Sequence, residues 1–224
     1  MIRRGAPSLE GYRTTGAEVS NISIKRVGAR TKAGSSPIPV VSFASAFAWS
    51  TWLDSHHRSS HGAWLKIAVK AAGLKSVTYT EALDVALIWG WIDGQKRKFD
   101  ESWWLQKFTP RRSRSVWSRI NRDKATALIA AGKMMPAGVE EVERAKKDGR
   151  WERAYESQRT SSVPEDLAMA LANKPHAARF FATLEAHNRY AILWRVQNAK
   201  RAETRARRIA QFVEMLAKGA KLHP

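Results

Sequence analysis

The residues best suited to chemistry are concentrated between Ala86 and Trp117. This stretch holds five of the ten tryptophans of the chain, Asp93 next to a glycine, and a basic run after Pro110. From Gln95 to Lys124 the sequence carries ten Lys or Arg residues against three acidic residues. Arginine binds phosphate through paired hydrogen bonds, and exposed indole rings stack on bases. The stretch therefore predicts a basic, aromatic face that binds an anionic partner, either nucleic acid or a phosphate-bearing ligand.

The predicted anion-binding residues are arginines of this stretch and of the C-terminal part: Arg97, Arg111, Arg112, Arg114, Arg205 and Arg208. The residues predicted to stack on a ligand or to line a pocket are Trp89, Trp91, Asp93, Trp103 and Trp117. The alternative is that a tryptophan lies in the core and that the aliphatic part of an arginine side chain covers its ring. For any single tryptophan we favour this alternative. For Arg111 and Arg112, a surface anion contact and a solvated position are equally open.

Arg205 is the arginine whose place follows most directly from helical spacing. Ile209, Phe212, Val213 and Leu216 form an apolar stripe at helical spacing, and Arg205 lies four residues before Ile209. Its side chain should therefore project from the core face of the last helix. Since a buried guanidinium must be paired, we expect an acidic partner or a bound anion, with Asp93 as the first choice.

A catalytic role is the alternative to a binding role. Asp93 beside Gly94 could act as a general base, although an aspartate that binds its own backbone in a turn is commoner. The sequence shows no paired carboxylates, no Ser-His-Asp order and no glycine loop for phosphate. We therefore favour a non-enzymatic protein without a cofactor. The alternative is an enzyme of unknown class with a pocket around Asp93, Trp91 and Arg205.

A metal site is the second alternative. His57 and His61 are four residues apart and could face one metal ion if one helix contained both. Gly62 and the serines around Arg58 argue against such a helix, and the chain has no cysteine for a thiolate site. We therefore predict a polar loop here and no metal.

The composition limits the class of partner and the compartment. The formal net charge is +19 and the pI is about 10.7, so the field around the protein attracts polyanions. No apolar run approaches the ~20 residues that span a bilayer. The first residues contain two arginines but lack the apolar segment of a secretory signal. We therefore expect a cytoplasmic protein.

The elements that position these residues are predicted from periodicity and capping. Residues 1–40 show no period and are predicted to be a flexible basic leader. A helix should begin near Phe43 with Ser42 or Ser45 as its cap, and a strand should follow over residues 64–70. Thr78 to Glu81 fits a capping box for a helix that ends at Ile88. Residues 91–99 and 103–109 should then form a hairpin that pairs with the earlier strand.

The rest of the chain is predicted to be helical. The expected helices span residues 115–131, 136–147, 164–172, 175–184, 187–198 and 201–218. The fold class is therefore α+β, mostly helical, with a small antiparallel sheet in the central part and an all-helical C-terminal half. We expect a mixed α/β subdomain over residues 41–158 and a helical subdomain over residues 164–224.

Several blocks of the sequence resemble a bacterial protein family. The blocks are WLKIAVK, YTEALDVALIWGWIDGQ, FTPRRSRSVWS, PAGVEEVERAKKDGRW and NRYAILWRVQNAKRAETRARRI, and together they extend over roughly residues 42–223. The order is similar to that of the YdeI/OmpD-associated family, whose members are described as bacteriocin-protection proteins. The resemblance implies a protection or stress-response role and association with an outer-membrane porin. It implies no catalytic residue and no cofactor.

Overall fold

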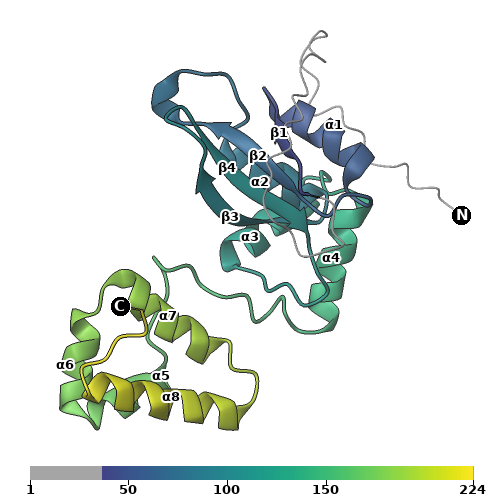
Figure 1. The fold of residues 1–224 in the computed structure, drawn as a ribbon. Helices are drawn as coiled ribbons and strands as arrows, with labels where there is room; N and C mark the ends of the chain where they lie inside the picture. The colour runs from purple at the N-terminus through teal and green to yellow at the C-terminus, as the bar shows by residue number, and fades with distance from the viewer. Residues whose placement is uncertain (1–36, 224) are drawn as a thin grey trace, which may run out of the picture. The chain divides into compact units, whose positions relative to one another are not determined.

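The fold combines a small sheet with several helices. The computed structural model describes residues 37–223, so the expected leader lies outside the described residues except for its last four positions. Within the described range, eight α-helices and one four-stranded sheet confirm the predicted α+β class (Figure 1). The chain divides into two compact units. The N-terminal unit comprises residues up to 115 and residues 121–152, and the C-terminal unit comprises residues 116–120 and 153–224.

The sheet of the N-terminal unit is mixed. Its strands are β1 (Val40–Ser42), β2 (Ala63–Ala68), β3 (Trp91–Lys98) and β4 (Trp103–Pro110), in the order β1-β2-β4-β3. The predicted hairpin of β3 and β4 is confirmed, and β4 pairs with β2 in antiparallel orientation. The prediction of a purely antiparallel sheet is wrong for β1, which runs parallel to β2. A helix, α1 (Ala46–His56), lies between the two strands, and a helical crossover is the usual connection of parallel neighbours.

Two helices cover one face of this sheet. Helix α1 begins at the predicted cap Ser45, and α2 (Tyr79–Ile88) begins with the predicted capping box of Thr78 and Glu81. Trp49 of α1 is completely buried, and its ring lies 5.8 Å from that of Phe108 on β4. Its indole N–H donates to the Ala82 carbonyl of α2 at 3.2 Å. These contacts join α1, α2 and the sheet in one core.

Two glycines allow α4 (Pro136–Lys147) to approach the end of α2 closely. Gly90 has a φ of +73°, and a Cβ atom there would lie 2.7 Å from the Ala137 carbonyl oxygen. A Cβ atom at Gly138 would lie 2.3 Å from the Ile88 carbonyl oxygen. The Met135 N–H also donates to that carbonyl oxygen at 3.2 Å. Side chains larger than hydrogen would separate the two backbones, so these glycines determine the packing distance.

Helix α3 (Arg119–Ala130) begins four residues later than predicted. The preceding residues have extended backbone, because Ser118 forms a parallel bridge with Tyr155. The Tyr155 N–H donates to the Trp117 carbonyl at 2.9 Å, and the Arg119 N–H donates to the Tyr155 carbonyl at 2.8 Å. A pairing with a segment distant in sequence therefore replaces the first turn of the predicted helix.

The C-terminal unit contains four helices with a core of their own. They are α5 (Glu165–Ala172), α6 (Pro175–Thr183), α7 (Ala186–Gln197) and α8 (Ala202–Ala217). The predicted apolar stripe of α8 is confirmed, because Ile209, Phe212, Val213 and Leu216 are all buried. They pack in one apolar cluster with buried residues of the other three helices. No helix in the described range is long and apolar enough to cross a membrane.

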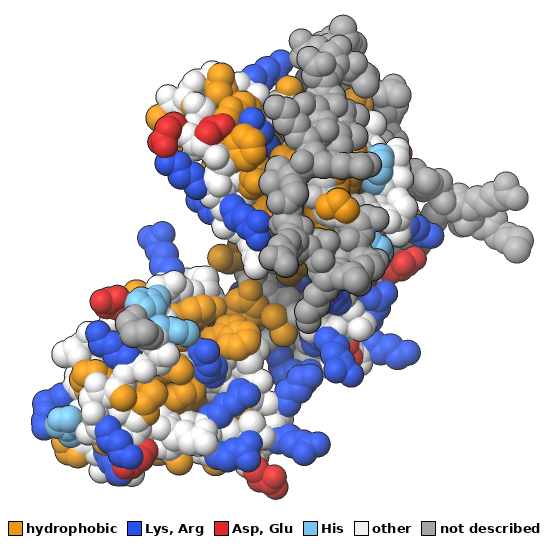
Figure 2. Space-filling view, viewed as in Figure 1, with side chains coloured by type: hydrophobic (Ala, Val, Ile, Leu, Met, Phe, Trp, Pro, Cys, Tyr) orange, Lys and Arg blue, Asp and Glu red, His pale blue; other side chains and the backbone are white. Residues whose placement is uncertain are grey.

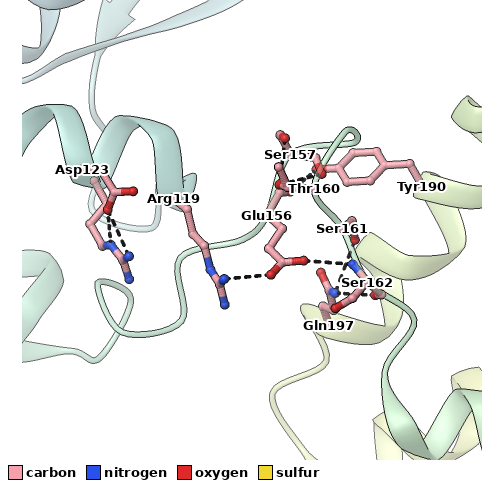
Figure 3. Close-up of polar contacts among 10 residues, drawn as sticks. Arg119, Asp123, Glu156, Ser157, Thr160, Ser161, Ser162, Tyr190 and Gln197 are labelled. Carbon is pink, nitrogen blue, oxygen red and sulfur yellow. Dashed lines mark hydrogen bonds and ion pairs between the residues drawn. The ribbon is translucent and has the colours of Figure 1, made fainter.

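A polar network joins the first residues of the C-terminal unit to α7 (Figure 3). The Glu156 carboxylate accepts from the Arg119 guanidinium at 2.8 Å and from the Ser162 N–H at 3.0 Å. The Tyr190 hydroxyl of α7 donates to the Glu156 carbonyl at 2.9 Å. Burial raises the pKa of the Tyr190 hydroxyl, and neighbouring Tyr155 adds to this shift. This hydroxyl therefore stays protonated at neutral pH and can act as the donor.

Candidate anion-binding face of the sheet

The face of the sheet opposite α1 and α2 combines cationic and aromatic side chains. Successive side chains of a strand point to opposite faces, so Leu65 and Ile67 of β2 enter the core under the helices while Trp64 and Lys66 lie on the other face. Trp64 is only 9% exposed there, because it packs in a small buried cluster with Val40 and Leu105. The strand register continues this second face across the sheet, because Lys66 pairs with Leu105 of β4 and Leu105 pairs with Arg97 of β3. Trp64 pairs with Lys107. We call this surface the outer face and define it by Trp64, Lys66, Arg97, Phe99, Trp103, Leu105 and Lys107.

The cations of the outer face lie over aromatic rings. The Arg97 guanidinium is 4.4 Å from the Trp64 ring centre, and the Lys107 ammonium is 5.7 Å from it. The Lys66 ammonium lies 4.5 Å from the Trp103 ring and 4.4 Å from the Phe99 ring. Such contacts hold a cation in place without neutralising its charge.

Among the described residues, no carboxylate pairs with these three cations. Within the part of the chain that the structure describes, Lys66, Arg97 and Lys107 form no ion pair. Lys98, in contrast, pairs with Glu101 at the tip of the hairpin. On the side of the molecule shown in Figure 2, Lys and Arg side chains clearly outnumber acidic ones. The outer face therefore presents fixed positive charge that a ligand can neutralise.

A bulge in β3 places Arg97 on the outer face. Simple alternation predicts Asp93 and Arg97 on one face, but the pairing with β4 shifts between Asp93 and Lys96. The buried Gln106 side chain donates to the Gly94 carbonyl at 2.9 Å and holds this irregular backbone. Asp93 therefore pairs with Phe108 on the core side, while Arg97 pairs with Leu105 on the other side. The bulge separates an acidic group from the cations of the outer face.

The predicted residues after β4 do not join this face. Arg111 is only 5% exposed, so the predicted anion contact at the surface is wrong for this residue. Its backbone N–H donates to the Gly90 carbonyl at 3.0 Å. Arg112 and Arg114 are exposed in the following turn. Trp117 is buried, so the prediction that its ring stacks on a ligand is wrong. The alternative prediction, that Trp117 is a core residue, is confirmed.

Arg111 lies within a buried group of charges near α4. Burial raises the pKa of the Glu141 carboxyl, against the opposing effect of Arg144, Arg111 and Arg150. Arg150 is 8% exposed, pairs with Asp148 at 2.8 Å and donates to the Ser115 carbonyl. Arg111 and Arg150 are buried while Arg144 is exposed, so the two buried arginines of this group have a structural position.

Arg205 has the acidic partner predicted for it, but the partner is Asp166. Its guanidinium donates to both Asp166 oxygens, at 2.6 and 2.9 Å, and to the Val196 carbonyl at 3.0 Å. The Arg205 hydrogen bond is the main cause that lowers the pKa of the Asp166 carboxyl. Arg208 donates to the Arg195 carbonyl. Both arginines therefore stabilise the helical unit, and the expected pair with Asp93 is wrong.

The remaining predicted residues lie in or beside the core of the N-terminal unit. Trp91 is 1% exposed and donates to the His57 carbonyl at 3.2 Å. Asp93 accepts a hydrogen bond from the Tyr79 hydroxyl at 2.9 Å. The pocket expected around Asp93, Trp91 and Arg205 is therefore wrong, because Trp91 is enclosed and Arg205 is paired elsewhere. Trp89 is 5% exposed and lines a different pocket.

The two histidines considered for a metal site lie at and after the end of α1. The His57 Nδ1 lies 2.9 Å from the Leu53 carbonyl oxygen and therefore acts as a donor to it. His61 follows the helix in a bend. Among the described residues, no group of three His, Asp or Glu side chains is arranged to hold a metal ion.

Sequence reasoning identified Arg97 and Trp103 of the outer face but missed its centre. Trp64 and Lys66 lie more than thirty residues earlier in the chain. Their alternation with Leu65 and Ile67 was the available signal, because it already placed them on the face opposite to the core. What was missing was the register that brings β2 beside β4.

Comparisons with protein families assign the two parts of the chain differently. Residues 160–219 match the family described as "Bacteriocin-protection, YdeI or OmpD-Associated". This match confirms the resemblance noted from the sequence for the four-helix segment. Residues 41–141, which include the sheet except for Val40, match a domain of unknown function, DUF8412. A search of the curated proteins and a search of the solved structures each found no match to this chain.

Proposed function

We infer that this chain, whose residues 160–219 belong to the bacteriocin-protection, YdeI or OmpD-associated family, is a non-enzymatic protein that binds an anionic polymer through its outer face. The polymer that best suits this face is single-stranded nucleic acid. The observation that supports the proposal is a set of three cations that lie over aromatic rings and have no carboxylate partner in the described part of the chain: Lys66, Arg97 and Lys107. We propose a cytoplasmic location for this activity.

The spacing of the cations favours a polymer over a small anion. Lys66 and Arg97 lie on either side of the β4 residue Leu105, so they are separated by two strand spacings, roughly 10 Å. Lys107 lies two residues from Leu105 along β4, which corresponds to roughly 7 Å. Cations whose backbone positions span this area suit several phosphates of one strand better than a single phosphate. Successive phosphates of an extended strand can contact all three.

Aromatic side chains at the margin of this face provide a place for bases. Phe99 is 41% exposed, and Trp103 is half-buried beside it. Stacking of a base on such a ring adds affinity with little sequence preference. The proposed activity is therefore binding of single strands with weak base specificity and strong salt dependence.

Fluorescence anisotropy of a labelled oligothymidylate over a salt series tests the proposal. In the triple variant Lys66→Gln, Arg97→Gln and Lys107→Gln, the glutamine stems continue to cover the rings while the three charges are lost. Because each phosphate contact contributes about 0.7 to the slope of log K against log salt for single strands, the slope should fall by about 2. We expect affinity at low salt to fall roughly tenfold or more.

A control with the same loss of charge separates a local site from the general field. Lys200, Arg201 and Arg207 are exposed residues of the C-terminal unit. Their simultaneous change to glutamine should leave the slope nearly unchanged. Equal losses in the two triple variants would show that the +19 charge acts diffusely and would refute the assignment to the outer face.

The matched family name suggests a cellular role that is compatible with this activity. We propose that the protein contributes to protection against bacteriocins or related stress, with the outer face as the binding surface. In a strain that lacks the protein, wild-type chain should restore survival during bacteriocin challenge, and the Lys66, Arg97 and Lys107 triple variant should not. Full rescue by the triple variant would separate protection from polyanion binding.

A further inference from the structure

The structure contains a pocket that the proposed binding face does not use. It has a volume of about 450 Å³ and lies in the N-terminal unit where the ends of α1 and α2 meet the start of α4. Its lining residues are Asp54, His57, Arg58, Trp89, Met135, Pro136 and Ala137. We propose that this pocket binds a small aromatic zwitterion, of the chemical class of a free aromatic α-amino acid.

The walls of the pocket are held in place before any ligand binds. Gly90 and Gly138 bring the end of α2 and the start of α4 into direct backbone contact. The Met135 N–H donates to the Ile88 carbonyl, which fixes the residue just before α4. The Trp89 indole N–H donates to the Ser50 hydroxyl at 3.1 Å, which holds the Trp89 ring in place. A preformed pocket of this size is typical of small-molecule sites.

The floor of the pocket is apolar. Trp89, Met135, Pro136 and Ala137 contribute ring, thioether, pyrrolidine and methyl groups. The polar atom of the Trp89 ring is already satisfied by Ser50, so the ring presents only apolar surface to a ligand. The His57 ring lies 4.7 Å from the Trp89 ring and continues this surface. A flat apolar group is the ligand moiety that such a floor favours.

The rim of the pocket carries two opposite charges that do not neutralise each other. Asp54 and Arg58 are four residues apart at the end of α1, both are exposed, and they form no ion pair with each other. A carboxylate of the ligand can therefore pair with the Arg58 guanidinium, and an ammonium group can pair with Asp54. Because the rim carries one charge of each sign and therefore no net charge, a zwitterion suits the pocket better than a multiply charged anion. This excludes the phosphate chain proposed for the outer face as its preferred ligand.

His57 also lines the pocket and provides a hydrogen-bond acceptor. Its Nδ1 donates to the Leu53 carbonyl at 2.9 Å, so in the neutral ring the Nε2 is the acceptor. An ammonium N–H of the ligand is a suitable donor to this nitrogen. The arrangement therefore provides one cationic group, one anionic group and one neutral acceptor around an apolar floor.

Fluorine NMR with para-fluorophenylalanine tests this assignment in the full chain. Two analogues serve as matched ligands: para-fluorophenylpropionate lacks the ammonium group, and para-fluorophenethylamine lacks the carboxylate. Arg58→Gln should weaken the amino acid and the propionate about tenfold but leave the amine unchanged, since one charge-assisted pair is lost. Asp54→Asn should weaken the amino acid and the amine about tenfold but leave the propionate unchanged.

Controls distinguish a loss of ligand binding in the pocket from unfolding of the protein and from ligand binding at the outer face. Asp54 and Arg58 are exposed, so both variants should keep the wild-type melting temperature. Arg112→Gln, an exposed arginine outside the pocket, should bind all three ligands as the wild type does. In amide NMR spectra, para-fluorophenylalanine should shift the Ala137 and Trp89 signals. Absence of binding, wild-type affinity of both pocket variants for para-fluorophenylalanine, or shifts confined to the outer face would overturn the proposal.

Discussion

A single arginine shows how far spacing along a helix identifies an ion pair. The position of Arg205 four residues before Ile209 predicted an acidic partner, and the structure confirms one. The identity of that partner depends on which helix packs beside α8. Asp166, in the first turn of α5, is the partner, whereas Asp93 lies on β3 of the other unit. Spacing predicts the face of a residue, and packing selects the group that it meets.

Arg205→Ala should destabilise the C-terminal unit by about 1–2 kcal/mol at neutral pH. The side chain is 29% exposed and that of Asp166 is 41% exposed, so solvent screens the pair and the cost is smaller than for a fully buried one. Urea denaturation followed by circular dichroism measures this cost. An unchanged free energy of unfolding would show that the pair adds nothing to the stability of the fold.

The pH dependence of this cost has a definite sign. The pKa of Asp166 in the folded protein is below its ordinary value of 3.8, so its contribution to stability requires the ionised carboxylate. The difference between wild type and Arg205→Ala should be complete at pH values above 3.8. It should disappear as the pH falls through the lower pKa of the folded state. A difference that grows in acid would contradict this assignment.

Element-scale packing in the N-terminal unit depends on backbone contacts that hydrophobic periodicity does not reveal. The register of β2, β3 and β4 creates the outer face, and the bulge held by Gln106 decides which side Arg97 takes. Likewise, α4 can lie against the end of α2 only because Gly90 and Gly138 have no side chains. Helices and strands are local, whereas these contacts join segments far apart in the chain.

Gly138→Ala should destabilise the N-terminal unit by about 3 kcal/mol or more. Alanine favours a helix over glycine by about 1 kcal/mol, but the new methyl group would lie 2.3 Å from the Ile88 carbonyl oxygen and 2.9 Å from that of Leu87. These atoms belong to backbone and cannot rotate away. Chemical denaturation monitored by tryptophan fluorescence measures the loss.

Gly132→Ala is the matched control for this packing effect. Gly132 has a φ of +66° but has open space around the position of a Cβ atom. Its substitution by alanine should therefore lower the free energy of unfolding by only about 1–2 kcal/mol, because alanine disfavours the left-handed backbone conformation. If Gly138→Ala were no more destabilising than Gly132→Ala, the conclusion that α2 and α4 are in close backbone contact at Gly138 would be refuted.

On the scale of the whole molecule, each of the two units has a buried core of its own among the described residues. Leu65 belongs to the core of the N-terminal unit, and Leu216 belongs to the cluster formed by α5 to α8. Both side chains are completely buried. The family comparisons also change between these parts, since residues 41–141 and residues 160–219 match different families. Each unit can therefore be expected to unfold as its own cooperative structure.

Calorimetry should show two unfolding transitions in the full chain. Leu65→Ala and Leu216→Ala each remove a fully buried side chain and should each cost about 2–5 kcal/mol. Each substitution should lower the temperature of one transition and leave the other in place. A single transition lowered by both substitutions would show that the two units unfold together.

The sequence by itself determined most of the segments that become helices and strands, although not β1. Capping residues and period determined the starts of α2 and α4, the stripe of α8 and the hairpin, because these signals act over a few residues. For α1 they left Ser42 and Ser45 open as the cap, and the structure has Ser45. Charge composition alone predicted attraction to polyanions.

Only the tertiary structure decided which side chains meet. It buried Arg111, paired Arg205 with Asp166, delayed the start of α3 and joined Trp64 and Lys66 to Arg97 and Lys107. It also brought Asp54 and Arg58 to the rim of a pocket closed by α4. Strand register, bulges and contacts between distant helices are set by packing against the rest of the chain, so local pattern cannot specify them.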